Sequence, residues 1–212
     1  MNVRTLHRSA LGLLVLVLAA ASPLHAQAGP LSWALHGGVV RPIGAFANYF
    51  EMGANAGFGV AYPLRDRLDL KLDVDFDFLN RHEFYPTPNM KLWRSGVGVE
   101  ADVLGDQGSD RFLVRAQAGI GATVLRSGEF WVEARPSIQG ERIKKTSFGG
   151  LGGLRLGVRT GSGLIWWLGA RFNWTPLDDV TAESLRLASR SQEDQPSAAT
   201  TAVLSLGFNL NR

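Results

Sequence analysis

The sequence predicts an all-β protein that folds as an eight-stranded antiparallel up-and-down barrel. Apolar and polar residues alternate along eight segments, and the connections between these segments alternate between short and long. The 25 glycines are spread among residues typical of strands rather than gathered in linkers. A period of two in hydrophobicity indicates a strand whose two faces meet different environments.

The third segment shows this alternation most clearly, because leucine, valine and phenylalanine alternate there with aspartate and lysine. The fourth and fifth segments alternate apolar residues with arginine, glutamate, glutamine and glycine. The sixth to eighth repeat the pattern, and the first two follow it less regularly. The eight predicted strands are residues 31–40, 54–62, 68–79, 93–103, 112–124, 148–158, 166–174 and 202–210.

Connections of unequal length separate these strands. The short ones are residues 63–67, 105–110 and 160–163, and the long, polar ones are 41–53, 80–89, 126–146 and 177–198. Short turns at one end and long loops at the other are typical of transmembrane β-barrels. An even strand number places both ends of the barrel domain on the short-turn side.

The first residues predict a secretory signal peptide. Two arginines precede an apolar run at residues 10–21, which is shorter than the ~18 to 20 residues that a membrane-spanning helix needs. Cleavage is expected after Ala26, with Ala28 as the alternative, and no cysteine follows to carry a lipid anchor. The predicted organisation is a signal peptide at 1–26 and one outer-membrane barrel domain at 27–212.

The charge balance and the absence of cysteine exclude several classes of protein. The net charge of +3 falls to +1 without Arg4 and Arg8, since 20 basic residues then face 19 acidic ones. A nucleic-acid partner is therefore not expected. Disulfides and thiolate metal sites are impossible without cysteine. No cofactor and no metal are expected.

The aromatic residues on the apolar face indicate that this face contacts lipid. They gather near the strand ends, as the interfacial girdles of membrane barrels do. The predicted girdle on the short-turn side is Trp33, Tyr62, Phe112, Trp166 and Phe208. The one on the long-loop side is Phe76, Phe78, Trp93, Phe148, Phe172 and Trp174.

The opposite face is rich in glycine and charge, which suits the narrow interior of an eight-stranded barrel. The chain has four lysines against eighteen arginines, and arginine is the better residue for desolvated ion pairs. Six acidic and six basic residues are predicted to form a paired network in a closed lumen. They are Asp69, Lys71, Asp73, Asp75, Asp77, Arg94, Glu100, Asp102, Arg115, Arg155, Arg159 and Arg171.

The first part of the barrel domain in the sequence resembles that of a known group of proteins. Its residues are Gly38, Pro42, Gly44, Phe46 and Gly53, then a strand ending in Tyr62-Pro63-Leu64 and the strand at 68–78. This arrangement resembles the eight-stranded bacterial outer-membrane β-barrel superfamily, which includes the transmembrane domain of outer membrane protein A and the opacity proteins. The resemblance implies export, an outer-membrane location and assembly by the barrel assembly machinery. Members usually end on an aromatic residue, whereas this chain ends on Arg212.

Few residues suggest catalysis. His36 is predicted to line the lumen, and His82 lies beside Glu83 in a long loop without the His-x-Ser pattern of lipid-modifying barrels. The aspartates of the third strand could bind a cation, but their match with basic residues favours ion pairs. The glycines at 149–153 lack the lysine of a phosphate loop. Loop residues that could contact anionic glycans or lipopolysaccharide phosphates are Phe130, Trp131, Arg135, Arg142, Lys144 and Lys145.

The function expected from these patterns is non-enzymatic. It is that of an integral, porin-like outer-membrane barrel of the cell envelope, with outer-membrane lipids and lipopolysaccharide as partners and an unknown external ligand for its loops. Three alternatives remain: a lipid-A-modifying barrel enzyme, a soluble periplasmic lipocalin-like carrier, and a small-solute pore.

The connection lengths generate a prediction about orientation. Residues 126–146 and 177–198 belong to the long-loop side, so protease added to intact cells should cut within them. The fragments would be identified by mass spectrometry. Cleavage confined to 105–110 would show the opposite orientation.

Overall fold

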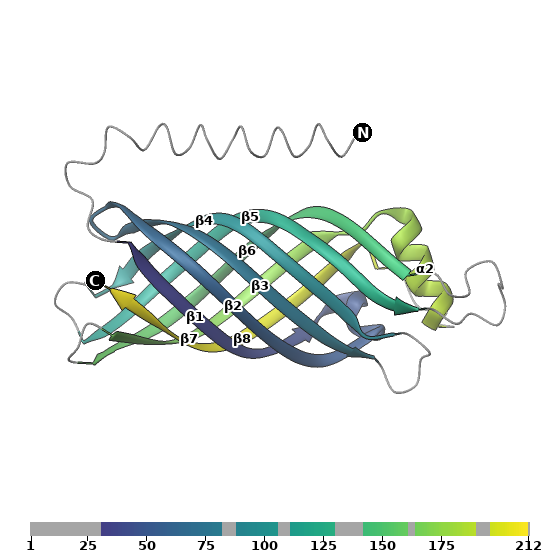
Figure 1. The fold of residues 1–212 in the computed structure, drawn as a ribbon, viewed down its shortest axis with the longest axis horizontal. Coiled ribbons are helices and arrows are strands. Elements are labelled where there is room, and N and C mark those ends of the chain that lie inside the picture. Colours follow the sequence, from purple (N-terminus) through teal and green to yellow (C-terminus); the bar gives the residue numbers. More distant parts are fainter. Residues whose placement is uncertain are drawn as a thin grey trace.

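The computed structural model describes residues 31–81, 88–105, 111–129, 142–160, 164–189 and 196–211, and the predicted signal peptide lies outside them. The strands are β1 (Ser32–Pro42), β2 (Phe50–Arg65), β3 (Leu68–Arg81), β4 (Met90–Leu104), β5 (Phe112–Glu129), β6 (Arg142–Thr160), β7 (Leu164–Pro176) and β8 (Ala198–Asn211). They form one closed antiparallel barrel in which β1 also pairs with β8 (Figure 1). The predicted eight-stranded barrel is confirmed.

Strand β3 shows why these residues form a barrel wall with two contrasting faces. Asp75 is 2% exposed and points into the barrel, whereas Phe76 beside it is 40% exposed on the outside. Because successive side chains of a strand point to opposite faces, the alternation in sequence becomes a charged interior and an apolar exterior.

The two ends of the barrel differ. β1 begins and β8 ends on the same side, where Ser32 pairs with Asn211; we call this side the turn end (Figure 1). The opposite side, the loop end, carries two short helices, η2 (Gly44–Asn48) and α2 (Asp179–Ser189). In the part of the chain that the structure describes, no helix has the length and apolar composition needed to cross a membrane.

Several predicted boundaries were wrong at the loop end, where the strands continue further. β5 runs to Glu129 and β6 begins at Arg142, so Arg142, Lys144 and Lys145 belong to a strand rather than to a loop. The predicted loop 177–198 contains α2, and the predicted loop 41–53 contains η2 and the start of β2. The alternation of apolar and polar residues continues beyond the predicted strand ends. There, however, the apolar residues point into the barrel and the polar residues point outward.

The alternation of connection lengths holds with one exception. Two residues join β2 to β3 and three join β6 to β7, whereas residues 130–141 and 177–197 separate strands at the loop end. The connection 43–49 is as short as 105–111 at the turn end, because β1 and β2 both extend past their predicted limits.

Glycines on the inner face make room for neighbouring groups. A Cβ at Gly157 would collide with the ring of Trp167, and one at Gly57 would collide with His36 and Asp75. Within the glycine run at 149–153, the inward Gly149 and Gly153 instead lie against the backbone of β7. The side chains of Thr175 and Gln117 also lie close, at 3.1 and 3.0 Å from the Cβ positions of these two glycines.

This packing generates a test. Gly157→Val should destabilise the barrel by about 1 to 3 kcal/mol, because overpacking displaces the Trp167 ring. Gly152→Val is the matched control on the same strand, since the nearest atom to its added Cβ is 3.9 Å away. Urea unfolding in detergent would measure both, and equal midpoints would contradict the packing argument.

Candidate functional site

The lumen gathers the charged residues of the barrel wall. All twelve residues of the predicted charge network occupy inward positions, and ten of them are almost fully buried. Asp102 and Arg159 are half-buried near the turn end. The network has three parts that follow one another from the turn end to the loop end.

Arg115 is the centre of the first part. Its Nη2 donates to Asp69 Oδ2 at 2.7 Å, its Nη1 donates to Glu100 Oε2 at 2.9 Å, and its Nε donates to Asp102. One guanidinium of β5 therefore neutralises carboxylates on both β3 and β4. Its position is set by the register, since Arg115 lies directly opposite Asp102 on β4.

Arg155 carries this group across the lumen to the last strand. Its Nη1 donates to Glu100 Oε1 at 2.7 Å, and its Nη2 donates to Asn209 Oδ1 of β8 at 3.0 Å. The guanidinium also lies 4.6 Å from the centre of the Trp167 ring. Glu100 thus receives a different arginine on each oxygen, and residues of β3, β4, β5, β6 and β8 become linked.

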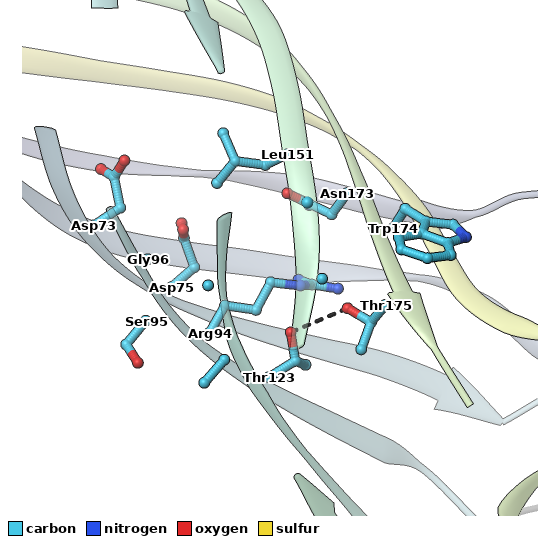
Figure 2. Close-up of a pocket in the computed structure, with 14 residues that line it drawn as sticks. Asp73, Asp75, Arg94, Ser95, Gly96, Thr123, Leu151, Asn173, Trp174 and Thr175 are labelled. Carbon is cyan, nitrogen blue, oxygen red and sulfur yellow. Dashed lines mark hydrogen bonds between the residues drawn. The ribbon is translucent and has the colours of Figure 1, made fainter. Parts of the chain in front are cut away.

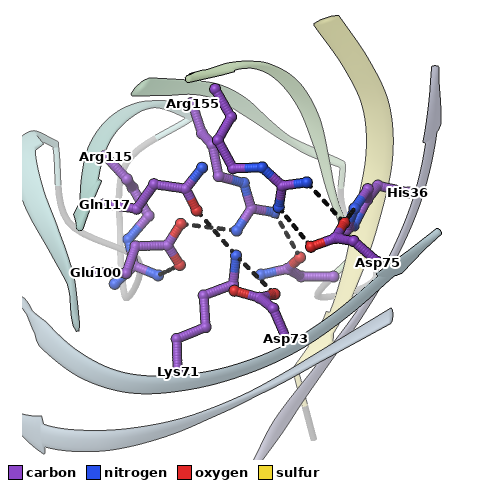
Figure 3. A network of polar contacts seen from close by, with 10 residues as sticks. His36, Lys71, Asp73, Asp75, Glu100, Arg115, Gln117 and Arg155 are labelled. Carbon is purple, nitrogen blue, oxygen red and sulfur yellow. Dashed lines mark hydrogen bonds and ion pairs between the residues drawn. The ribbon is translucent and has the colours of Figure 1, made fainter. Parts of the chain in front are cut away.

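The second part lies in the middle of the barrel (Figure 3). Lys71 Nζ is 3.1 Å from Asp73 Oδ1 and donates to Gln117 Oε1 at 3.0 Å. Asp75 receives two partners: His36 Nε2 lies 2.7 Å from its Oδ1, and Arg171 Nη1 donates to its Oδ2 at 2.8 Å. The structure therefore places His36 in the lumen, held by a carboxylate.

The third part leads toward the loop end and contains neutral polar groups. Asp77 accepts hydrogen bonds from Asn55 at 2.6 Å and from Arg94, which also donates to Thr201 at 3.2 Å. Beyond it, the hydroxyls of Thr123 and Thr175 are 3.0 Å apart (Figure 2). These amide and hydroxyl partners were not predicted, because single threonines and asparagines give no periodic signal.

An apolar cluster fills the lumen at the loop end. Phe46 and Tyr49 come from the β1–β2 connection and Leu185 from α2, so both helices cover this end. The strands contribute inward-pointing residues, all almost fully buried: Val40, Phe50, Leu79, Met90, Leu92, Leu125, Ala199 and Val203. The alternation in the sequence did not predict this cluster.

A smaller apolar cluster lies toward the turn end. It consists of Leu113, Ile165 and Trp167, each no more than 1% exposed. The charged network is therefore flanked by apolar groups on both sides. Two cavities of about 20 Å³ each lie in the lumen, one lined by Asp73 and Arg94 and the other by His36 and Lys71. A cavity of that size holds about one water molecule.

An ion pair fixes α2 to the barrel wall. Lys145 Nζ of β6 donates to Asp178 Oδ2, and the Thr181 backbone amide donates to Asp178 Oδ1 at 3.3 Å, as in a helix N-cap. Partial burial favours the neutral acid, but the hydrogen bonds from Lys145 and Thr181 outweigh it and hold the pKa of Asp178 below its ordinary value.

The chemistry available in this lumen is mainly that of ion pairing. Each of the six aspartates and glutamates in the network is already paired with a lysine or arginine. Among the described residues, no cluster of three histidine, aspartate or glutamate side chains suits a metal ion. The balanced arrangement matches the ion-pair interpretation of the aspartates on β3.

The predicted girdle residues lie on the outer surface. Nine of the eleven are exposed, and Tyr62 and Phe208 are half-buried. Neighbouring strands bring some of them into contact: the Phe76 and Trp93 rings pack edge to face at 4.4 Å, and the Trp166 and Phe208 rings lie 5.7 Å apart. The predicted loop residues Phe130, Trp131 and Arg135, together with His82 and Glu83, lie outside the described residues.

Comparison with solved structures finds the same architecture. Neisserial surface protein A matches with a TM-score of 0.58 and 12% identity over 88% of this chain and 99% of that one. The N-terminal β-barrel domain of Pseudomonas aeruginosa OprF matches with a TM-score of 0.50 and 13% identity over 86% and 99%. The chain has the fold of a small outer-membrane β-barrel. Identities this low show the fold alone.

The outer membrane enzyme PagL also matches, with a TM-score of 0.43 and 13% identity over 85% of this chain and 99% of that one. A likeness at that level carries no functional inference. No protein-family model and no curated protein sequence matches the chain.

The contacts of Arg115 generate a stability prediction. Arg115→Ala removes one base from three carboxylates, and breaking a buried pair typically costs about 3 to 5 kcal/mol. Arg142→Ala breaks the exposed pair with Glu129 instead and should change stability by less than about 0.5 kcal/mol. Urea unfolding of the refolded barrel would compare them. Equal midpoints would indicate that the lumen charges are hydrated.

Proposed function

We propose that this chain is an integral, non-enzymatic outer-membrane barrel with a closed lumen that contributes to envelope structure. The observation that carries the proposal is the polarity of the wall, with charge inside and large apolar side chains outside. A soluble carrier of lipids needs the reverse arrangement, because its ligand occupies an apolar interior.

The extent of the apolar exterior supports a membrane location. Large aliphatic and aromatic side chains are exposed on all eight strands. Soluble monomers rarely expose more than a few hundred Å² of contiguous apolar surface. In a closed barrel every backbone group of the wall is paired within the sheet, which is the condition for crossing lipid with strands.

The height of this exterior fits a bilayer. On β4 the outward positions from Trp93 to Val103 carry no charge. Ten residue steps at ~3.3 Å each, tilted by ~40°, span about 25 Å, which is the height of the apolar band of outer-membrane barrels.

The contents of the lumen support a closed barrel rather than a pore. Eight strands enclose an interior just wide enough for side chains. Here that interior holds paired charges between two apolar clusters, and the two cavities beside His36, Lys71, Asp73 and Arg94 each have room for about one water.

The position of the described histidine supports a non-enzymatic role. His36 is the one histidine in the described ranges, and it is held by Asp75 inside the barrel. A lipid outside the wall is out of reach of this imidazole. The proposed partners are outer-membrane lipids including lipopolysaccharide, the barrel assembly machinery during biogenesis, and an external ligand of the loops.

Fractionation and conductance test the two halves of this proposal. The chain should fractionate with outer membranes and show a heat-modifiable shift on gels, since a closed barrel resists detergent until it is heated. Recovery in the soluble periplasmic fraction would overturn the membrane location. In planar bilayers the refolded protein should give no steady ion current, and stable conductance steps would overturn the closed lumen.

A further inference from the structure

Three basic side chains form a row on the outer surface at the loop end. Lys91 of β4 lies directly opposite Arg126 of β5, and Arg126 lies directly opposite Lys144 of β6. All three are exposed and point outward. Neighbouring strands are ~4.8 Å apart, so the basic row of Lys91, Arg126 and Lys144 spans about 10 Å.

This basic row has no acidic counterpart among the described residues. Glu129 is the one carboxylate on the loop-end part of β4, β5 and β6, and it is bonded to Arg142. No ion pair of the described chain reaches the row, in contrast to the lumen, where every acid of the network has a base. Like charges directly opposite each other on neighbouring strands are destabilising. An anionic ligand would remove that repulsion.

The row lies immediately beyond a band of aromatic side chains. Trp93 is the next outward residue of β4 after Lys91, and its ring packs on Phe76. Lys91 Nζ itself lies 5.8 Å from the centre of the Phe78 ring. On β6, Phe148 follows Lys144 two outward positions further into the barrel wall. Aromatic rings of membrane barrels mark the boundary between hydrocarbon and headgroups, so the row lies at headgroup depth.

Within the described residues, the row is confined to one side of the barrel. On the flanking strand β3 the residue directly opposite Lys91 is Phe78, and on β7 the outward Trp174 lies opposite Gly150 of β6. Arg41 of β1 also faces outward, but it lies opposite Ala202 of β8 and not opposite another base. Three cations on adjacent strands therefore form a local site rather than a uniform basic ring.

We propose that Lys91, Arg126 and Lys144 bind the phosphate groups of lipopolysaccharide lying against β4, β5 and β6 on the loop side of the membrane. The inference rests on the proposed membrane location. A headgroup with more than one phosphate matches three cations spread over about 10 Å. Arg126 at the centre offers a planar donor pair to one phosphate, and the two lysines add flexible ammonium groups on either side.

The test measures binding of diphosphoryl lipid A to the full barrel in phosphatidylcholine nanodiscs. The triple variant K91Q/R126Q/K144Q should bind it at least about tenfold more weakly than the wild type, because basic residues near a membrane surface add to the attraction of anionic lipid. The matched control R41Q/R65Q/R111Q loses the same charge away from the row and should stay within twofold. Monophosphoryl lipid A should bind the wild type more weakly than the diphosphoryl form.

Three results would overturn the proposal. The first is that the wild type and the triple variant bind diphosphoryl lipid A with equal affinity. The second is that the control variant loses as much affinity as the triple variant. The third is that phosphatidylglycerol competes equally well for binding, which would indicate a general attraction to anionic lipid. Insertion into pure phosphatidylcholine vesicles is measured separately by flotation. A chain that inserts but shows no phosphate preference would contradict this site alone, whereas a chain that does not insert would contradict the proposed function as well.

Discussion

The pairing of charges inside the barrel is the constraint on which the rest of the structure depends. Taking an ion out of water costs several kcal/mol even after the protein relaxes, and only close partners with good geometry offset that cost. Arg115 with its three carboxylates, and Glu100 with a different arginine on each oxygen, show how this is achieved. Glycine at positions 57 and 59 follows from the same constraint, since an added Cβ would collide with the carboxylates of Asp75 and Asp73.

The eight strands and the inward position of the charged residues could be anticipated because both rest on a local pattern. A strand such as β3 alternates strictly, so its two faces can be read directly from the chain. The individual partners could not be anticipated in this way. Arg171 bonds Asp75 from four strands away, and Lys71 donates to the neutral Gln117 besides pairing with Asp73, because barrel closure and register decide which side chains meet.

The apolar cluster at the loop end was missed because the prediction assumed that the apolar face points outward everywhere. Near the loop end the faces exchange: Leu92 and Leu125 point inward, while Lys91 and Arg126 point outward. Adjacent apolar residues mark the exchange, as in Phe78-Leu79, Leu92-Trp93 and Val124-Leu125. Trp166-Trp167 marks the corresponding place toward the turn end. Helix α2 was missed for a different reason, since its short stretch resembles a polar loop apart from a few buried residues such as Ala182 and Leu185.

The seam between β1 and β8 has a consequence for the kinetics of folding. It joins the two strands that are furthest apart in the chain, and β8 also supplies Asn209 to Arg155 and Thr201 to Arg94. The polar network is therefore complete only after the last strand has docked. Opening the seam breaks the backbone ladder and these side-chain contacts together. The contacts that form last during folding therefore have to break first during unfolding, and they oppose that step. A barrel closed in this way stays folded because it unfolds slowly, as well as because its folded state is stable at equilibrium.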